Sequence, residues 1–226
     1  MALNWRPWLR EQRGFLIFLL GLGVMRGALA DWNPVPTGSM RPTVLEGDVV
    51  LVDKRAYDWR LPFTAIDLHR HGEPQRGDVV VAFSPADGTR LLKRLVAVPG
   101  DTVAVVDGAL WLNGAPVPLS AGQAVDGEPT PLGPLPAWRA DEALPEGKTH
   151  AVQRLPVAGP LQQMAPLTLA ADTYFLMGDN RDNSADSRAF GPVPRRLLVG
   201  RVSRLLVSLD AQALAPRWER VGLPLR

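Results

Sequence analysis

The chain has 226 residues, a hydrophobic content of 46% and a formal net charge of +2, so it is long enough to bury a full core. The small net charge and the lack of basic runs interleaved with aromatic residues argue against nucleic acid as a partner. The absence of cysteine excludes disulfides, thiolate metal sites and cysteine nucleophiles, but it leaves the compartment open because exported proteins need not contain disulfides.

The N-terminal segment predicts a membrane anchor. An apolar run at residues 14–25 follows three arginines, and positive charge on the first flank of an apolar segment keeps that flank in the cytoplasm. We therefore expect residues 1–13 to be cytoplasmic and residues 14–32 to form one transmembrane helix in contact with membrane lipid. The rest of the chain is then expected on the extracytoplasmic (periplasmic) side of the cytoplasmic (inner) membrane.

A cleaved secretory signal is the alternative for this segment. Ala28-Leu29-Ala30 fits an A-x-A cleavage site after a short apolar core. Arg26 interrupts the approach to that site, and for this reason we favour a retained anchor. The sequence does not tell whether the site is cut.

After the anchor, the pattern predicts a mainly β protein with an antiparallel sheet or barrel-like catalytic domain. Short runs rich in β-branched residues follow Gly-Asp turns, and Asp107-Gly108 is a two-residue hairpin signal. The predicted strands are residues 49–52, 79–83, 91–98, 102–106, 109–112, 173–177 and 197–209.

The remaining segments predict an insertion and a short tail. Residues 113–171 are crowded with proline and glycine, which indicates an inserted β-rich subdomain of unknown role. The catalytic core is accordingly predicted at residues 33–112 and 172–226. The tail from Asp210 is predicted to form a short helix that is broken near Pro216.

Ser39 and Lys93 indicate a serine hydrolase that works without histidine. Lys93 is one of only three lysines in a chain that otherwise uses arginine, and its apolar run predicts a largely buried strand. A desolvated lysine can lose its proton and act as a general base, whereas arginine cannot. The alternative is a strand lysine that keeps its amine in water, but a polar loop at residues 178–188 favours the catalytic interpretation.

Three segments resemble the type I signal peptidases (leader peptidases), which are membrane-bound Ser-Lys serine proteases. They are PTGSMRPT at residues 36–43, KRLVAVPGD at residues 93–101 and GDNRDNSADSR at residues 178–188, in the family's order. The resemblance implies a membrane-anchored endopeptidase that removes signal peptides from exported preproteins after small residues. It implies no metal and no cofactor, and it leaves the oligomeric state unknown.

The resemblance also implies residue roles. It identifies Ser39 as the nucleophile and Lys93 as the general base. It identifies Ser184 as the hydroxyl that orients the lysine amine, and Asp186 with Arg188 as supporting residues.

The oxyanion hole is a further implication of the resemblance. The Ser39 backbone N–H and the Thr37 hydroxyl are expected to stabilise the oxyanion. Thr37 departs from the serine that is commoner at this position in the family. Its extra methyl group narrows the rotamers available to the hydroxyl.

Two sequence patterns resemble metal sites but lack the ligands that such sites need. Residues 179–186 superficially resemble a calcium loop, because Asp182, Ser184 and Asp186 alternate. An EF-hand needs glycine and glutamate where this chain has Ser187 and Val193. His69 and His71 lack a third ligand at a suitable spacing and are predicted to be exposed. We therefore predict no metal site.

Two other functions stay open. A specialised Ser-Lys peptidase that processes a conjugation or pilus substrate would carry the same motifs. A catalytically silent, membrane-anchored β domain that acts as a binding module belongs to a different class, and a cleavage assay on a preprotein distinguishes it.

Overall fold

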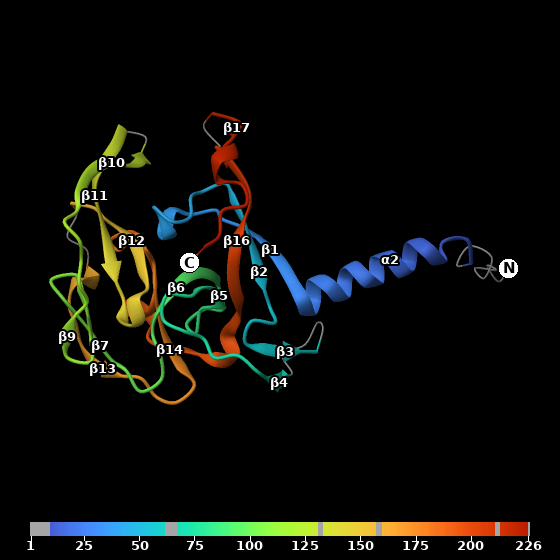
Figure 1. The fold of residues 1–226 in the computed structure, drawn as a ribbon, viewed down its shortest axis with the longest axis horizontal. Coiled ribbons are helices and arrows are strands. Elements are labelled where there is room, and N and C mark those ends of the chain that lie inside the picture. Colours follow the sequence, from blue (N-terminus) through green and yellow to red (C-terminus); the bar gives the residue numbers. More distant parts are fainter. Residues whose placement is uncertain (1–9, 62–66, 131–132, 157–159, 211–212, 226) are drawn as a thin grey trace.

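The computed structural model describes residues 10–61, 67–130, 133–156, 160–210 and 213–225, and it confirms a mainly β, antiparallel fold (Figure 1). Within that part, eight strands form the main sheet, in the order β1-β2-β16-β5-β6-β14-β15 with β17 paired to β16. Their bounds are β1 (Ala30–Pro34), β2 (Asp48–Asp53), β5 (Val79–Phe83), β6 (Arg90–Ala97), β14 (Thr173–Met177), β15 (Val193–Pro194), β16 (Leu198–Asp210) and β17 (Ala215–Pro216).

Three smaller sheets accompany the main one. The first has the order β13-β7-β8-β9, the second β10-β11-β12, and the third is the β3-β4 pair. Their bounds are β3 (Asp58–Arg60), β4 (Asp67–Arg70), β7 (Thr102–Val106), β8 (Ala109–Leu112), β9 (Ala115–Pro116), β10 (Gln123–Thr130), β11 (Gly133–Ala143), β12 (Thr149–Arg154) and β13 (Met164–Thr168). In Figure 1, β7 and β9 to β13 lie on the side of the molecule opposite the N-terminal helix.

The strand pairing bears on the predicted insertion at residues 113–171. Strands β7 and β8, which the sequence assigned to the core, belong to the β13-β7-β8-β9 sheet rather than to the main sheet, with β7 paired to β13 and β8 paired to β7. We therefore propose that the subdomain begins near Asp101 instead of Asn113. A shared cluster that includes Val96, Leu110 and Phe175 packs the two regions together.

Short helices precede, connect and follow the strands. They are α2 (Arg13–Val24), the π-helix η1 (Met25–Leu29), the 3-10 helices η2 (Gly38–Met40), η3 (Pro145–Gly147), η4 (Pro160–Gln162), η5 (Arg195–Leu197) and η6 (Trp218–Arg220), and α3 (Ser187–Phe190). The predicted hairpin between β7 and β8 is confirmed. Asp107 and Gly108 both have positive φ, at 50° and 72°, as a type I′ turn requires.

The predicted C-terminal helix after Asp210 is wrong. Ala215 and Pro216 instead form β17 against the end of β16, and within the described part of the tail the single 3-10 turn η6 is the only helical element that follows. Arg220 donates a hydrogen bond of 2.7 Å to the fully buried carboxylate of Asp48. This tertiary pairing draws the tail back onto the main sheet and overrides the local helix propensity.

The transmembrane helix predicted at residues 14–32 differs from the helix that the structure describes. Within the described residues, no helix combines the length and the apolarity that crossing a bilayer requires. Helix α2 ends at Val24 and, after the π-helix, the chain enters β1 at Ala30, so the last three residues of the predicted anchor at 14–32 belong to the main sheet. In Figure 1, α2 projects away from the sheets.

A buried carboxylate explains why the chain leaves the helix there. Asp31 accepts hydrogen bonds of 3.0 Å from Arg26 and from Arg90, and it is only 4% exposed. The possible cleavage site Ala28-Leu29-Ala30 is bound to the same sheet, because the Lys54 N–H donates to the Leu29 carbonyl oxygen. Cleavage there would require the edge strand to leave the sheet.

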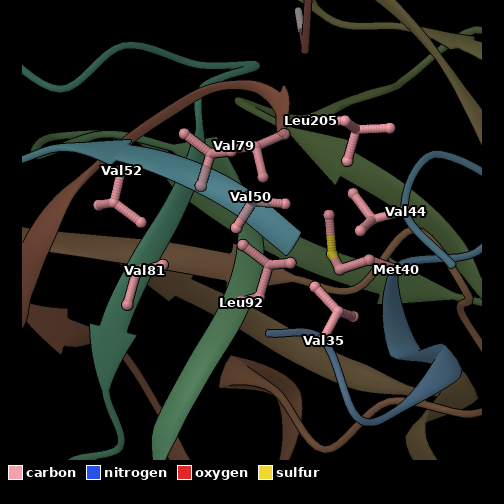
Figure 2. Packing of buried hydrophobic residues seen from close by; sticks show 10 residues of the cluster. Val35, Met40, Val44, Val50, Val52, Val79, Val81, Leu92 and Leu205 are labelled. Carbon is pink, nitrogen blue, oxygen red and sulfur yellow. The ribbon is translucent and has the colours of Figure 1, made fainter. Parts of the chain in front are cut away.

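A cluster of valine, leucine and methionine side chains fills the space beside the main sheet (Figure 2). Val50 and Val52 come from β2, and Val79 and Val81 from β5. Met40, which directly follows Ser39, is completely buried in this cluster. The core therefore fixes the turn that carries the predicted nucleophile.

Candidate active site

Ser39 lies in the short 3-10 helix η2 and is partly exposed. Its carbonyl oxygen accepts a hydrogen bond from the Asn180 backbone N–H at 3.1 Å. The Asn180 side-chain amide donates to the carbonyl oxygen of the neighbouring Gly38 at 3.0 Å. The core on one side and the 178–188 loop on the other thus hold the hydroxyl at a defined place.

Lys93 lies on β6, where every residue from Leu92 to Ala97 is buried, as the sequence predicts. Its amine donates a hydrogen bond to the Ser39 hydroxyl oxygen, with 2.7 Å between Nζ and Oγ. A second hydrogen bond of 3.0 Å goes to the Leu92 carbonyl oxygen. The two residues that sequence analysis selected are therefore in direct contact, although 54 positions separate them.

The environment of Lys93 favours the neutral amine. Only 4% of the residue is exposed, and this burial lowers the pKa of the Lys93 amine to about 8. The negative charges of Asp186 and Asp179 offset part of the effect, because they favour the ammonium form. An amine with this pKa has a substantial unprotonated fraction at mildly alkaline pH and can accept a proton from Ser39.

A groove of about 360 Å³ lies over the Ser39–Lys93 pair. Its walls come from the segment before the nucleophile, from β6 and from the 178–188 loop, and its lining residues include Val35, Thr37, Met40, Arg90, Leu92, Asn183 and Ala185. Thr37 is exposed on the same wall as Ser39, so its hydroxyl is accessible to a molecule in the groove.

Ser184 is buried close to the pair but is not hydrogen-bonded to Lys93. Its hydroxyl has no hydrogen-bond partner within the described residues, and the amine uses the Leu92 carbonyl instead. Gly178 separates Ser184 from Ser39: a Cβ atom there would lie 2.3 Å from the Ser184 Oγ and 2.4 Å from the Ser39 carbonyl oxygen. Only glycine therefore permits this close approach.

Asp186 and Arg188, the two residues expected to support the site, form a buried ion pair with each other. Arg188 donates to both carboxylate oxygens at 2.8 Å, and the Gly178 N–H donates to one of them at 3.0 Å. Burial alone would raise the pKa of the Asp186 carboxyl, but these hydrogen bonds and the charge of Arg188 bring it below its ordinary value. The carboxylate is therefore ionised and ties the start of the loop to its end.

A second buried ion pair was missed by the sequence analysis. The Arg94 guanidinium binds both oxygens of Asp179 at 2.8 Å, and Thr43 donates to the same carboxylate at 2.5 Å. Both charged side chains are 1% exposed. The signal in the sequence was Arg94 in the middle of an apolar strand, because a buried charge needs a partner of opposite charge.

The histidines lie apart from the Ser39–Lys93 contact. His69 and His71 are exposed, as predicted, with their rings stacked at 6.4 Å. His150 is buried instead, and burial lowers the pKa of its imidazole to about 4. No group of three or more histidine, acidic or cysteine side chains within the described ranges is arranged to hold a metal ion.

Replacing the buried lysine tests its electrostatic environment without substrate. At pH 7 we expect Lys93→Met to raise the melting temperature by roughly 3–6 °C, because the variant removes a charge that burial disfavours. The folded pKa lies below the unfolded value, so wild-type stability rises as pH increases from about 8 to about 10.4. Differential scanning calorimetry should therefore show that the difference in melting temperature between Lys93→Met and wild type shrinks over that range. A difference that does not change with pH would contradict a lowered pKa of Lys93.

Comparison with known proteins places the chain in a family. The family model described as "Signal peptidase, peptidase S26" matches residues 8–207. Signal peptidase I from Pseudomonas aeruginosa and that from Pseudomonas fluorescens are each 35% identical, with 98% of this chain and 81% of the relative covered. Signal peptidase I from Rickettsia prowazekii is 30% identical, with 85% and 78% covered. The chain therefore belongs to the peptidase S26 family of signal peptidases.

Proposed function

We propose that the protein is a membrane-anchored serine endopeptidase that removes signal peptides from exported preproteins with a Ser-Lys pair. The observation that carries this proposal is the 2.7 Å hydrogen bond between the Lys93 amine and the Ser39 hydroxyl at the base of an open groove. Family membership supports the substrate class, since relatives covering nearly the whole chain are named signal peptidase I.

The chemistry follows from the two contacting side chains. Neutral Lys93 takes the proton of the Ser39 hydroxyl as the oxygen attacks the scissile carbonyl. The Ser39 backbone N–H and the Thr37 hydroxyl stabilise the oxyanion that forms. The lysine ammonium then protonates the leaving amine. A water activated by the same neutral amine hydrolyses the acyl-enzyme, so the cycle requires no metal or cofactor.

The N-terminal helix supports attachment to the membrane. Large apolar side chains of α2 are exposed, including Phe15 at 58%, Phe18 at 63% and Leu20 at 67%. We propose that this segment anchors the chain in the cytoplasmic membrane, with the arginines before it on the cytoplasmic side and the sheets on the extracytoplasmic side. Extraction of membranes with alkaline carbonate tests this, because an anchored chain stays in the pellet.

A cleavage assay tests the proposed activity. Detergent-solubilised protein is incubated with a preprotein that has small residues before its cut site, and the products are analysed by mass spectrometry. We expect wild type to release the mature protein and Ser39→Ala to leave the precursor intact. A precursor left intact by wild type as well would favour a silent binding module. Cleavage of a few dedicated precursors alone would favour a specialised processing peptidase.

Ser184→Ala is expected to reduce kcat roughly 10–1000-fold without a loss of stability. The hydroxyl is buried beside the pair and makes no hydrogen bond within the described residues, and Asp186, whose pKa it helps to lower, keeps its hydrogen bonds from Arg188 and Gly178 in the variant. We propose that it contacts the lysine amine once substrate displaces the resting hydrogen bonds. Steady-state kinetics measure the loss of kcat, and thermal denaturation measures the stability of the variant. An unchanged kcat would show that Ser184 has no role in orienting the amine.

A further inference from the structure

The inserted subdomain contributes a buried carboxylate to the loop that holds the nucleophile. Glu142 lies on β11 and is 1% exposed. Its two oxygens accept hydrogen bonds from both terminal nitrogens of Arg181, one of them at 2.6 Å, and Arg181 is 3% exposed. This buried bidentate pair links β11 to the 178–188 loop.

Backbone hydrogen bonds join the same two regions. The Arg181 N–H donates to the Gln153 carbonyl oxygen on β12 at 2.9 Å, and the Gln153 N–H donates to the Asp179 carbonyl oxygen at 2.8 Å. On its other side, the segment contacts the nucleophile, because the Asn180 N–H donates to the Ser39 carbonyl oxygen. Residues 179–181 are therefore held between the subdomain and the turn that carries Ser39.

Arg181 also fixes the two ends of the loop. Its Nε donates to the Gly178 carbonyl oxygen at 3.2 Å, and its own carbonyl oxygen accepts a hydrogen bond of 2.7 Å from Arg188. Removing the carboxylate of Glu142 would leave the buried Arg181 guanidinium without the carboxylate that it binds, and only the charges of Asp179 and Asp186 would then oppose its own, which is unfavourable. We expect the segment to shift toward water and to draw Ser39 away from Lys93.

We propose that the inserted subdomain positions the catalytic nucleophile, and that Glu142 acts as a positioning residue through Arg181 and Asn180. The kinetic consequence rests on the proposed function, whereas the structural coupling does not. Displacement of reacting groups by about 1 Å can lower a rate by about 10²-fold, so the coupling has a measurable effect on catalysis.

The test compares Glu142→Gln with Asp141→Asn. Both substitutions remove one negative charge from β11, but Asp141 is exposed. We expect Glu142→Gln to lower kcat on the order of 10–100-fold with little change in KM, and Asp141→Asn to behave as wild type. A wild-type kcat for Glu142→Gln, or an equal loss in Asp141→Asn, would overturn the proposal.

Hydrogen exchange of the full chain provides a readout that needs no activity. In Glu142→Gln, amides of residues 178–188 and 36–43 are expected to exchange about fivefold faster or more, while those of β5 and β6 stay unchanged. The milder Glu142→Asp should show the same local change at smaller size. Unchanged exchange, or an increase across the whole chain, would overturn the positioning role. Local acceleration in a protein that never cleaves preprotein would keep the coupling and reject the proposed function.

Discussion

Lys93→Arg is expected to abolish preprotein processing, with a loss of at least about 10³-fold in kcat/KM. Arginine keeps a positive charge and a similar length, but its guanidinium cannot be deprotonated in a protein and cannot accept the proton of Ser39. The planar group also has to fit a space in which the lysine is 4% exposed. Cleavage of a purified preprotein, followed over hours, measures the residual rate.

Lys148→Arg is the matched control for this prediction. Lys148 is partly exposed, its amine lies 3.2 Å from a side-chain oxygen of Gln75, and it does not line the groove at Ser39. We expect this variant to process the preprotein at the wild-type rate. Processing by Lys93→Arg at more than a few per cent of the wild-type rate would rule out Lys93 as the general base.

Asp186→Ala is expected to destabilise the protein by roughly 3–5 kcal/mol, because it leaves Arg188 buried without its partner. For a chain of this size, that corresponds to a melting temperature lower by roughly 6–20 °C. The Gly178 N–H would also lose its acceptor beside the nucleophile, so activity falls together with stability. Thermal denaturation and the cleavage assay are measured on the same preparation.

The stability that Asp186 contributes depends on pH. The folded pKa of Asp186 is lowered, so its contribution to stability is present above the unfolded value of about 4 and is lost as pH falls below it. The stability difference between wild type and Asp186→Ala should therefore shrink on acidification. The exposed Asp141→Ala serves as the control. If Asp186→Ala lost activity with an unchanged melting temperature, the residue would act directly in catalysis instead.

Local sequence patterns were sufficient for most strands and for the central pair. Runs of β-branched residues at or after Gly-Asp turns specify β2, β5 and β7, because burial of alternating or continuous apolar side chains leaves few other conformations. The scarcity of lysine singled out Lys93, which the structure brings to Ser39.

Features that depend on long-range contacts were not predictable in this way. Glu142 looks like any charged residue of a polar strand, and only the fold shows that Arg181 reaches it. The path of the tail after Asp210 depends on the contact of Arg220 with Asp48, which lies 172 residues earlier in the chain, so local propensity misled the prediction of a helix. The end of the N-terminal helix likewise depends on the burial of Asp31 against Arg90.

The pH profile of kcat/KM tests most directly whether a lysine is the base. His150 is kept, since its pKa of about 4 places its titration outside the relevant range, while the exposed His69 and His71 are both replaced by glutamine. We predict that the rate rises with pH through a single ionisation near 8 in wild type and in the double variant alike, as neutral Lys93 forms. An acidic limb centred near the ordinary histidine value of about 6.5 that disappears in the double variant would contradict the Ser-Lys mechanism.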